Sequence, residues 1–433
     1  MRYTVLLLAA IAAVIAACGG SGPGGGEPSP TVSASPSSLP PPPPPTPSAS
    51  PSPPPTVPIP FLSDYRSPTP GAVAPPGAWS DCPAVVSADL EEGLHVLDAE
   101  SCGLTRIAEA PDAYGMSWSP DGVYLAFLRL QGLVQPVNAP GAESDLFLVR
   151  ADGSQAFQLT DSPGIRETSP VWSPDGSKLA YGVVPASDPN GGHDLIIHTI
   201  GNGSTAKIAH DFPCLQSYIW VPSGDQVILS AGCGFDEQYV TLLDLDSGET
   251  SVIPGVQSVL AVHPYGDLVA FSCDLNDPEI LERRGLCIGR LDGSELSSPV
   301  TLAAFPSFGT GSSARHDPII AYAAVWIRGG FQLAILSSTQ RGLFLLPAGG
   351  GPGSTVEDWV YSSLYWVTDN VVVASSCRFS GVVPCGPYVL TSYRLDTNES
   401  WEALIFNCGS AGGVWSPDGS QLAISTAQLA GCL

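Results

Sequence analysis

The sequence predicts an all-β protein, and within that class a β-propeller, from three observations. First, a strand that ends in Trp and is followed by Ser-Pro-Asp-Gly occurs at Trp118, Trp172 and Trp415. Second, each copy continues into a short apolar strand, as in Tyr124-Leu-Ala-Phe-Leu. Third, a further strand pair with an Asp-Gly or Ser-Gly turn lies between copies, as at Asp145-Leu-Phe-Leu-Val. A unit that recurs in this way indicates a repeat architecture.

Four weaker copies extend the pattern, and they start at Trp220, Val262, Trp326 and Trp366. The seven anchors lie about 50 residues apart on average, which is typical of propeller blades. Because each unit has four strands, we expect seven four-stranded blades. Six or eight blades are the alternatives, since Val262 lacks the aromatic ring and the copy at Trp366 is one residue shorter. The residues that we expect to build the blade turns are Trp118, Asp121, Gly122, Trp172, Asp175, Gly176, Trp220, Trp326, Trp366, Trp415, Asp418 and Gly419.

The two ends of the repeat region indicate how the propeller would close. After Trp415 there is room for only two strands, whereas a spare strand pair, 93–98 and 103–108, precedes Trp118. N-terminal strands that complete the last blade remove exposed sheet edges. We therefore expect this N-terminal pair to close the ring.

The Trp-Ser-Pro-Asp-Gly motif and the Leu-Ala-Phe strand that follows it resemble the TolB-type, WD-like "Pro-Asp" propeller repeat. The resemblance is close at Trp118, Trp172 and Trp415, and it extends in weaker form over residues 82–433. It implies that the aromatic residue packs between blades and that Pro-Asp-Gly forms the turn. The motif therefore predicts a fold and assigns no activity.

The N-terminus predicts export and a membrane anchor. The apolar run from Val5 to Ala17 would span about 20 Å as a helix, which is shorter than a bilayer core of about 30 Å. Residues 1–17 therefore read as a signal peptide. Ile15-Ala16-Ala17-Cys18 resembles a bacterial lipobox, so we expect Cys18 to be acylated and to bind the lipid bilayer. An ordinary signal peptide is the alternative.

Residues 18–77, rich in Gly, Ser and Pro, predict a disordered tether, because such a composition buries too little apolar surface to fold.

Overall, Asp and Glu outnumber Lys and Arg by 41 to 16, which gives a net charge of −25. This balance argues against a nucleic-acid partner. We expect a monomer that faces outside the cytoplasm, on the cell membrane or an outer membrane.

Ten cysteines follow Cys18, and an even number in an exported chain favours disulfides. They are Cys82, Cys102, Cys214, Cys233, Cys273, Cys287, Cys377, Cys385, Cys408 and Cys432. Their spacing favours local pairs in this order, with Cys82–Cys432 as an alternative. Zinc is disfavoured because no Cys-x-x-Cys pair is present.

Few motifs point to chemistry, since the sequence has no Gly-x-Ser-x-Gly, P-loop or His-Glu-x-x-His motif. His193, with Asp194, and His198 could hold a metal ion, and Asp244, Asp246 and Glu249 faintly resemble a calcium loop. Packing and turn roles are the simpler interpretations. We therefore expect no catalytic residue, no metal and no cofactor.

Four insertions interrupt the blades and are the better binding candidates, because loops on a rigid scaffold commonly carry recognition. They are 131–144, 184–193, 274–285 and 305–320, the last with Phe305, Phe308, Arg315 and His316. The main hypothesis is a non-enzymatic scaffold that binds a protein, peptide or glycan of the cell envelope. The alternative is a glycan lyase or hydrolase with a site in the central channel of the propeller.

Overall fold

The computed structural model describes residues 91–425, except for gaps at 99–100, 132–139, 189–190, 233–237, 267, 275–283, 293–320, 328–331, 338–341, 348–352, 358–362, 369–370, 378–387, 396–398 and 407–412. All of these residues belong to one compact unit, Pro51–Leu433. The signal peptide 1–17, the tether 18–77 and Cys18 lie outside the described residues, as do residues 305–320.

Every regular element in the described part of the chain is a β-strand. No helix there has the length and apolar character needed to cross a membrane. This all-β architecture confirms the fold class that the sequence predicts. The strands fall into seven antiparallel sets once the largest sheet is divided at its β5–β7 junction.

Sets 1 to 3 follow one another along the chain and have four strands each. They comprise β3 (Ala113–Trp118), β4 (Tyr124–Gln131), β5 (Glu143–Arg150) and β6 (Ala156–Gln158); β7 (Ile165–Trp172), β8 (Lys178–Pro185), β9 (Gly192–Thr199) and β10 (Thr205–Pro213); and β11 (Leu215–Trp220), β12 (Gln226–Ala231), β13 (Tyr239–Asp244) and β14 (Thr250–Ile253).

Sets 4 to 7 continue the series, with three described strands in set 4 and four in each of the others. They comprise β15 (Val256–Val262), β16 (Leu268–Asp274) and β17 (Arg284–Arg290); β18 (Ala321–Ile327), β19 (Gln332–Ser337), β20 (Gly342–Pro347) and β21 (Ser354–Glu357); β22 (Ser363–Thr368), β23 (Val371–Cys377), β24 (Tyr388–Arg394) and β25 (Glu399–Phe406); and β26 (Gly413–Trp415), β27 (Gln421–Ser425), β1 (Leu94–Asp98) and β2 (Leu104–Ala108).

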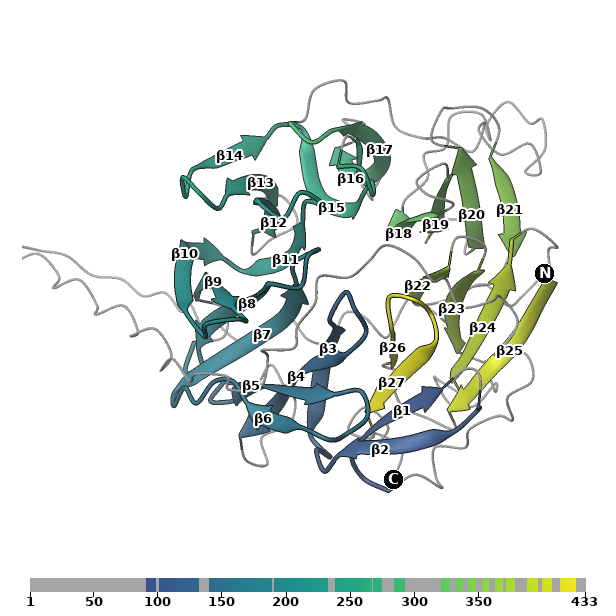
Figure 1. Cartoon of the computed structure of the whole chain (residues 1–433). Coiled ribbons are helices and arrows are strands. Elements are labelled where there is room, and N and C mark those ends of the chain that lie inside the picture. Colours follow the sequence, from purple (N-terminus) through teal and green to yellow (C-terminus); the bar gives the residue numbers. More distant parts are fainter. Residues whose placement is uncertain are drawn as a thin grey trace, which may run out of the picture. The chain divides into compact units, whose positions relative to one another are not determined.

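The first strand of each set contacts the first strand of the next, and these contacts form a closed cycle (Figure 1). The cycle runs β3, β7, β11, β15, β18, β22, β26 and back to β3. Such a cycle of sheets around a common centre is the arrangement of a propeller.

The N-terminal strands close the last set, as the sequence predicts. Strand β1 pairs antiparallel with β27, with Val96 opposite Ala423, and β2 lies on the outer side of β1. The Ser425 hydroxyl also donates a hydrogen bond to the carbonyl oxygen of Ala113 in set 1, over 2.5 Å. Pairing the two ends of the chain covers sheet edges that would otherwise be exposed.

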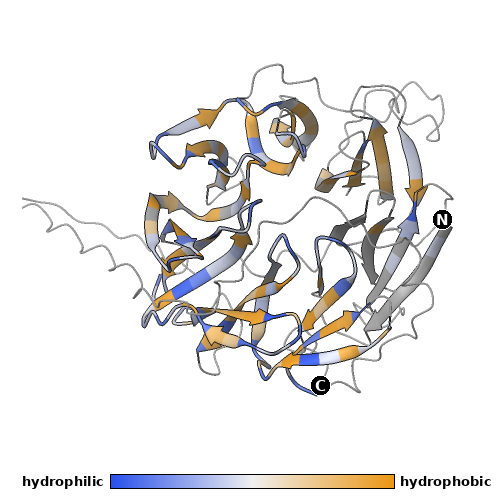
Figure 2. Cartoon of the chain, viewed as in Figure 1, coloured by the Kyte–Doolittle hydropathy of each residue, from blue (hydrophilic) through white to orange (hydrophobic). Residues whose placement is uncertain are grey.

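Apolar side chains fill the spaces between neighbouring sets, and Figure 2 shows hydrophobic colouring along much of the strand length. One core cluster joins Leu94 and Ala423 of set 7 to Leu125 of set 1. The next joins Leu146 of set 1 to Tyr181 of set 2. Further clusters join sets 2 and 3, 3 and 4, 4 and 5, and 5 and 6.

The repeated Trp residues pack as wedges between sets, as the resemblance implies. In four of them, Trp118, Trp172, Trp220 and Trp326, the indole N–H donates to a backbone carbonyl of the preceding set, one residue before its anchor. The donor–acceptor pairs are Trp118–Val414 (2.8 Å), Trp172–Ser117 (3.1 Å), Trp220–Val171 (3.1 Å) and Trp326–Ala261 (3.4 Å). Ala261 precedes Val262, so this weak anchor has the same place in the fold as the Trp residues.

The Ser-Pro-Asp-Gly segments are tight turns closed by their own side chains. Asp121 Oδ1 accepts hydrogen bonds from the Ser119 hydroxyl (2.5 Å) and the Val123 amide (3.0 Å). The Ser119 hydroxyl oxygen accepts from the Tyr124 amide at 2.9 Å. Gly122 has a φ of +69°, which glycine adopts without strain. The copies at Ser173 and Ser416 repeat these contacts.

Candidate functional site

Two of the four insertions meet at the joint between sets 1 and 2. The amide of Gly141, in the first insertion, donates to the carbonyl of Ala186, in the second, at 2.6 Å. The Ala186 amide donates in turn to the carbonyl of Gly164, just before β7, at 2.9 Å. We call this junction of 140–144, 184–188 and 191–193 with the 161–164 loop the rim.

Below the rim, the strands of two sets join. Ser144 of β5 pairs in parallel with Arg166 of β7, which is the one junction between sets among the described strands. The Ser144 hydroxyl donates to the backbone carbonyl of Glu167 at 2.8 Å. Figure 2 shows a hydrophilic stretch on β7 here. The joint therefore places polar groups inside an otherwise apolar interface.

Asp145 is a buried carboxylate with several donors. Its side-chain oxygens accept hydrogen bonds from the Gln131 amide group, from Gln158 Nε2 (3.1 Å) and from the Ser162 backbone amide (3.1 Å). Burial raises the pKa of Asp145, and nearby Asp161 adds to the rise, while the amide donors oppose it. These donors are what an ionised carboxylate requires in a buried place.

Glu167 is fully buried, and its two carboxyl oxygens have no hydrogen bond of normal geometry in the described part of the chain. Burial raises the pKa of Glu167 to about 8, and the charge of Asp145 adds to this rise. The hydroxyls of Ser162 and Thr160 lie beside the carboxyl and partly oppose the shift. Glu167 is therefore largely protonated at neutral pH unless a cation compensates its charge.

Arg166 lies at the same joint and is 6% exposed. Burial lowers the pKa of its guanidinium group, and the phenol of Tyr114 opposes that shift. Burial also raises the pKa of Tyr114 and lowers the pKa of His193. Arg166 therefore has a phenol and an imidazole among its neighbours, and burial favours the neutral form of both.

The structure does not bring the two candidate metal-binding histidines together. His193 and His198 both lie on β9, but an odd separation along a strand directs their side chains to opposite faces. His198 is 1% exposed, and burial lowers its pKa to about 4. Within the described ranges, no group of three or more His, Cys, Asp or Glu side chains is arranged to hold a metal ion.

The calcium-like segment forms a hairpin turn instead. Asp244 Oδ1 accepts hydrogen bonds from the Ser247 amide (2.9 Å) and the Ser247 hydroxyl (2.8 Å). Asp246 and Glu249 are exposed, and Gly248 has a φ of +71°. The acidic side chain of Asp244 therefore stabilises the β13–β14 turn.

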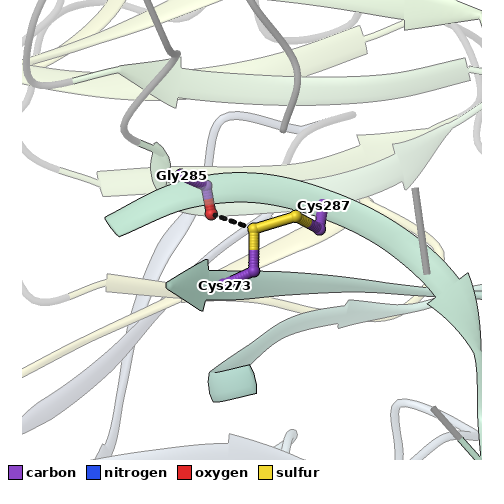
Figure 3. The surroundings of a disulfide bond; sticks show 3 residues. All are labelled: Cys273, Gly285 and Cys287. Atoms are coloured by element: carbon purple, nitrogen blue, oxygen red, sulfur yellow. Dashed lines mark hydrogen bonds between the residues drawn. A yellow bond between two sulfur atoms is a disulfide. The ribbon is translucent and has the colours of Figure 1, made fainter. Parts of the chain in front are cut away.

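One disulfide is described in full, between Cys273 on β16 and Cys287 on β17, with Cα atoms 5.9 Å apart (Figure 3). Cys273 Sγ lies 3.3 Å from the carbonyl oxygen of Gly285. Cys102 and Cys214 are also in disulfide form, and Cys377 ends β23. Outside the described residues lie Cys18, Cys82, Cys233, Cys385, Cys408 and Cys432, whose pairings stay predictions.

Sequence reasoning predicted the insertions but missed the buried groups beneath them. The signal that could have revealed Glu167 is its place five residues before an anchor Trp. The other copies have uncharged residues there, namely Ala113, Leu215, Gln257, Ala321, Tyr361 and Ser410. A carboxyl at a position where every other copy has an uncharged residue indicates a specific partner or role.

No family model matches the chain. A curated relative, a TolB homologue from Chlorobium luteolum, is 26% identical over 113 residues. That stretch is 26% of this chain and 22% of the homologue, so the match spans less than a quarter of that protein.

Solved structures show a likeness of fold. An oligogalacturonate lyase from Vibrio parahaemolyticus aligns with a TM-score of 0.53 at 14% identity, over 77% of this chain and 97% of the lyase. TolB from Acinetobacter baumannii aligns with a TM-score of 0.43 at 14% identity, over 71% of this chain and 64% of that protein. At such identities the likeness concerns the fold alone.

Proposed function

The chain carries a β-propeller of the TolB type, and on that premise we propose that it is an exported, lipid-anchored envelope protein whose propeller binds a partner. In this proposal the protein acts as a monomer without a cofactor. Its ligand is a protein, peptide or glycan of the envelope, and nucleic acid is not among its partners. The rim between sets 1 and 2 is the surface that binds.

The meeting of two insertions at the rim is the observation that carries this proposal. Main-chain hydrogen bonds link Gly141, Ala186 and Gly164, so the two loops are held against each other rather than projecting separately. Loops fixed on a rigid scaffold lose little conformational entropy when a ligand binds. The buried polar groups at the joint help to fix this surface.

Binding is favoured over catalysis by how the repeated side chains are used. Asp121, Asp175 and Asp418 accept hydrogen bonds within their own turns. The Trp indoles bridge neighbouring sets. The recurring polar groups therefore support the scaffold. The likeness to a lyase concerns the fold, so it does not favour a channel enzyme.

Export and anchoring are supported by the N-terminal sequence. Ile15-Ala16-Ala17-Cys18 resembles a lipobox, and the Gly/Ser/Pro-rich segment that follows has the composition of a spacer. The Cys273–Cys287 disulfide fits an oxidising compartment outside the cytoplasm. Replacing Cys18 with Ala should release the protein from membranes and abolish acyl labelling. Unchanged membrane retention of the Cys18→Ala protein would refute the anchor.

Partner binding is tested by affinity purification after chemical crosslinking in the native envelope. The variant Ser187→Lys/Asp188→Lys alters two exposed rim residues, and Asn202→Lys is the control at the far end of β9. We expect the rim variant to lose the partner that the wild-type and control proteins retain. Equal recovery by all three, or substrate turnover by the purified protein, would contradict the proposal.

A further inference from the structure

The joint beneath the rim buries two carboxyl groups, those of Asp145 and Glu167, together with one guanidinium group, that of Arg166. Asp145 is 3% exposed and Glu167 is fully buried. The charged groups that act on these carboxyls are themselves acidic, since Asp161 and Glu143 act on Asp145, and Asp145 acts on Glu167. One guanidinium group can offset at most one of two buried carboxylate charges, so the pair still requires either a proton or a further positive ion.

Oxygen atoms without hydrogen-bond partners gather around this pair. Within the described residues, both carboxyl oxygens of Glu167 and the Ser162 hydroxyl have no partner of normal geometry. The Ser162 side chain lies beside the Glu167 carboxyl and acts on its pKa. Thr160 lies there too, and its hydroxyl oxygen accepts from the Leu146 amide at 2.8 Å.

A further unpartnered oxygen comes from β8. Glu167 pairs in register with Val183, and Tyr181 lies two residues away, so Tyr181 and Glu167 share one face of the sheet. Tyr181 is fully buried, and its hydroxyl has no hydrogen bond in the described part of the chain. The unpartnered oxygens thus come from β7, from the loop before it and from β8.

The chemistry of these atoms selects a class of ligand. All of these atoms are oxygens, and hard cations prefer oxygen ligands to nitrogen or sulfur ligands. Ca²⁺ accepts irregular sets of carboxylate and neutral oxygens, whereas Mg²⁺ demands near-octahedral geometry and keeps its waters. Asp161, which is exposed and adjacent to Ser162, adds negative charge close to Asp145.

We propose that Asp145 and Glu167, with the hydroxyls of Ser162 and Thr160, form a binding site for a hard divalent cation of the Ca²⁺ type. The cation would link β5, the 160–162 loop and β7. It would thereby brace the joint that supports the rim. The site has only two carboxylates, and hydroxyl groups supply the other ligands. It is therefore compatible with the finding that the described residues contain no group of three or more His, Cys, Asp or Glu side chains arranged to hold a metal ion.

The test is thermal unfolding of the full chain, stripped with a chelator and then titrated with CaCl₂ or MgCl₂. Wild-type protein should gain a few degrees in Tm with CaCl₂ at concentrations well above Kd, and less with MgCl₂. Glu167→Gln should lose the CaCl₂ response, because it keeps the shape but not the charge. Glu249→Gln, which alters an exposed carboxylate on another set, should respond like wild type.

Isothermal titration with CaCl₂ gives a second readout if Glu167→Gln does not fold. Ser162→Ala removes one neutral oxygen and should bind Ca²⁺ roughly tenfold more weakly or worse. An absent CaCl₂ response in wild type, or a full response in Glu167→Gln, would overturn the site. So would a wild-type stability that falls between pH 4.5 and about 8 and is indifferent to CaCl₂, because a proton would then neutralise the pair.

This proposal is independent of partner binding. Failure of the cation titration would leave the rim crosslinking experiments unaffected, and loss of the partner from a rim variant would leave the CaCl₂ response in place. The two outcomes can therefore be distinguished on the same purified proteins.

Discussion

At the scale of single residues, the propeller tolerates buried ionisable groups only in their neutral or well-bonded forms. Asp145 is buried with three donors, whereas His198 is buried with no hydrogen bond to either ring nitrogen in the described part of the chain. The imidazole of His198 avoids the cost of burial by staying neutral, because burial lowers its pKa to about 4.

His198 should make the protein sensitive to acid. Its pKa is 6.5 when unfolded and about 4 when folded, so the unfolded chain binds a proton in this window that the folded chain does not. The stability that neutral His198 allows is present above pH 6.5. It falls by about 1.4 kcal/mol per pH unit as pH drops towards 4.

In the variant His198→Leu, one proton fewer should be taken up on unfolding, so the free energy of unfolding should depend less steeply on pH. Its value at pH 7 should rise by about 1 kcal/mol, because an unsatisfied buried group is lost. Denaturant unfolding at pH 7 and pH 5 measures both effects. His95 and His193, whose pKa values burial also lowers, contribute a slope of the same sign. Glu167, whose pKa burial raises to about 8, contributes a slope of the opposite sign in this window. An unaltered slope in His198→Leu would show that His198 does not titrate as described.

At the scale of elements, the stability of the ring depends on a turn and a wedge that recur from set to set. The turn needs a residue with positive φ, and the wedge needs an indole N–H that reaches the preceding set. Both requirements are local, so each can be tested by one substitution with a matched control.

Gly122→Ala isolates the backbone requirement of the turn. Gly122 has a φ of +69°, and a Cβ added there would meet no atom within 4 Å, so only backbone strain opposes the change. We expect the free energy of unfolding to fall by about 1 kcal/mol. Gly201→Ala is the control, because its Cβ would also meet no atom within 4 Å and its φ lies outside the left-handed region. Equal unfolding free energies for the two variants would refute the role of the turn.

Trp172→Phe isolates the wedge. It removes the indole N–H that donates to the Ser117 carbonyl at 3.1 Å and leaves a smaller ring between sets 1 and 2. We expect the free energy of unfolding to fall by about 2 kcal/mol, because the carbonyl loses its partner and the packing is reduced. The control Tyr265→Phe, at a side chain that is 78% exposed, should change stability by less than about 0.5 kcal/mol. Chemical denaturation of both variants measures the difference.

These elements are also where sequence reasoning works best. The Trp-to-turn spacing predicted the strands and the weak anchor Val262, and the resemblance to the TolB-type repeat implied the wedge, because those features repeat and depend on nearby residues. The pair Asp145 and Glu167 was not predictable in this way. Its neighbours come from β5, the loop before β7 and β8, which meet only once two sets have packed.

At the scale of the whole molecule, the pairing that closes the ring and the insertions between its strands have different roles. The β1–β27 pairing joins the two ends of the folded chain and completes the cycle of sets. The insertions at 131–144 and 184–193 form the loops of the β4–β5 and β8–β9 hairpins, and they meet at one joint through the Gly141–Ala186 hydrogen bond. The repeat therefore builds the fold, and we propose that the loops that interrupt it recognise the partner.

Site-specific photo-crosslinking tests this assignment most directly. A photoreactive residue would replace Asp188 at the rim or Asn202 at the opposite end of β9, both of which are exposed. In intact envelopes we expect one discrete crosslinked product from position 188, and none from position 202. Equal products from both positions, or a product from position 202 alone, would contradict the claim that the rim is the binding surface.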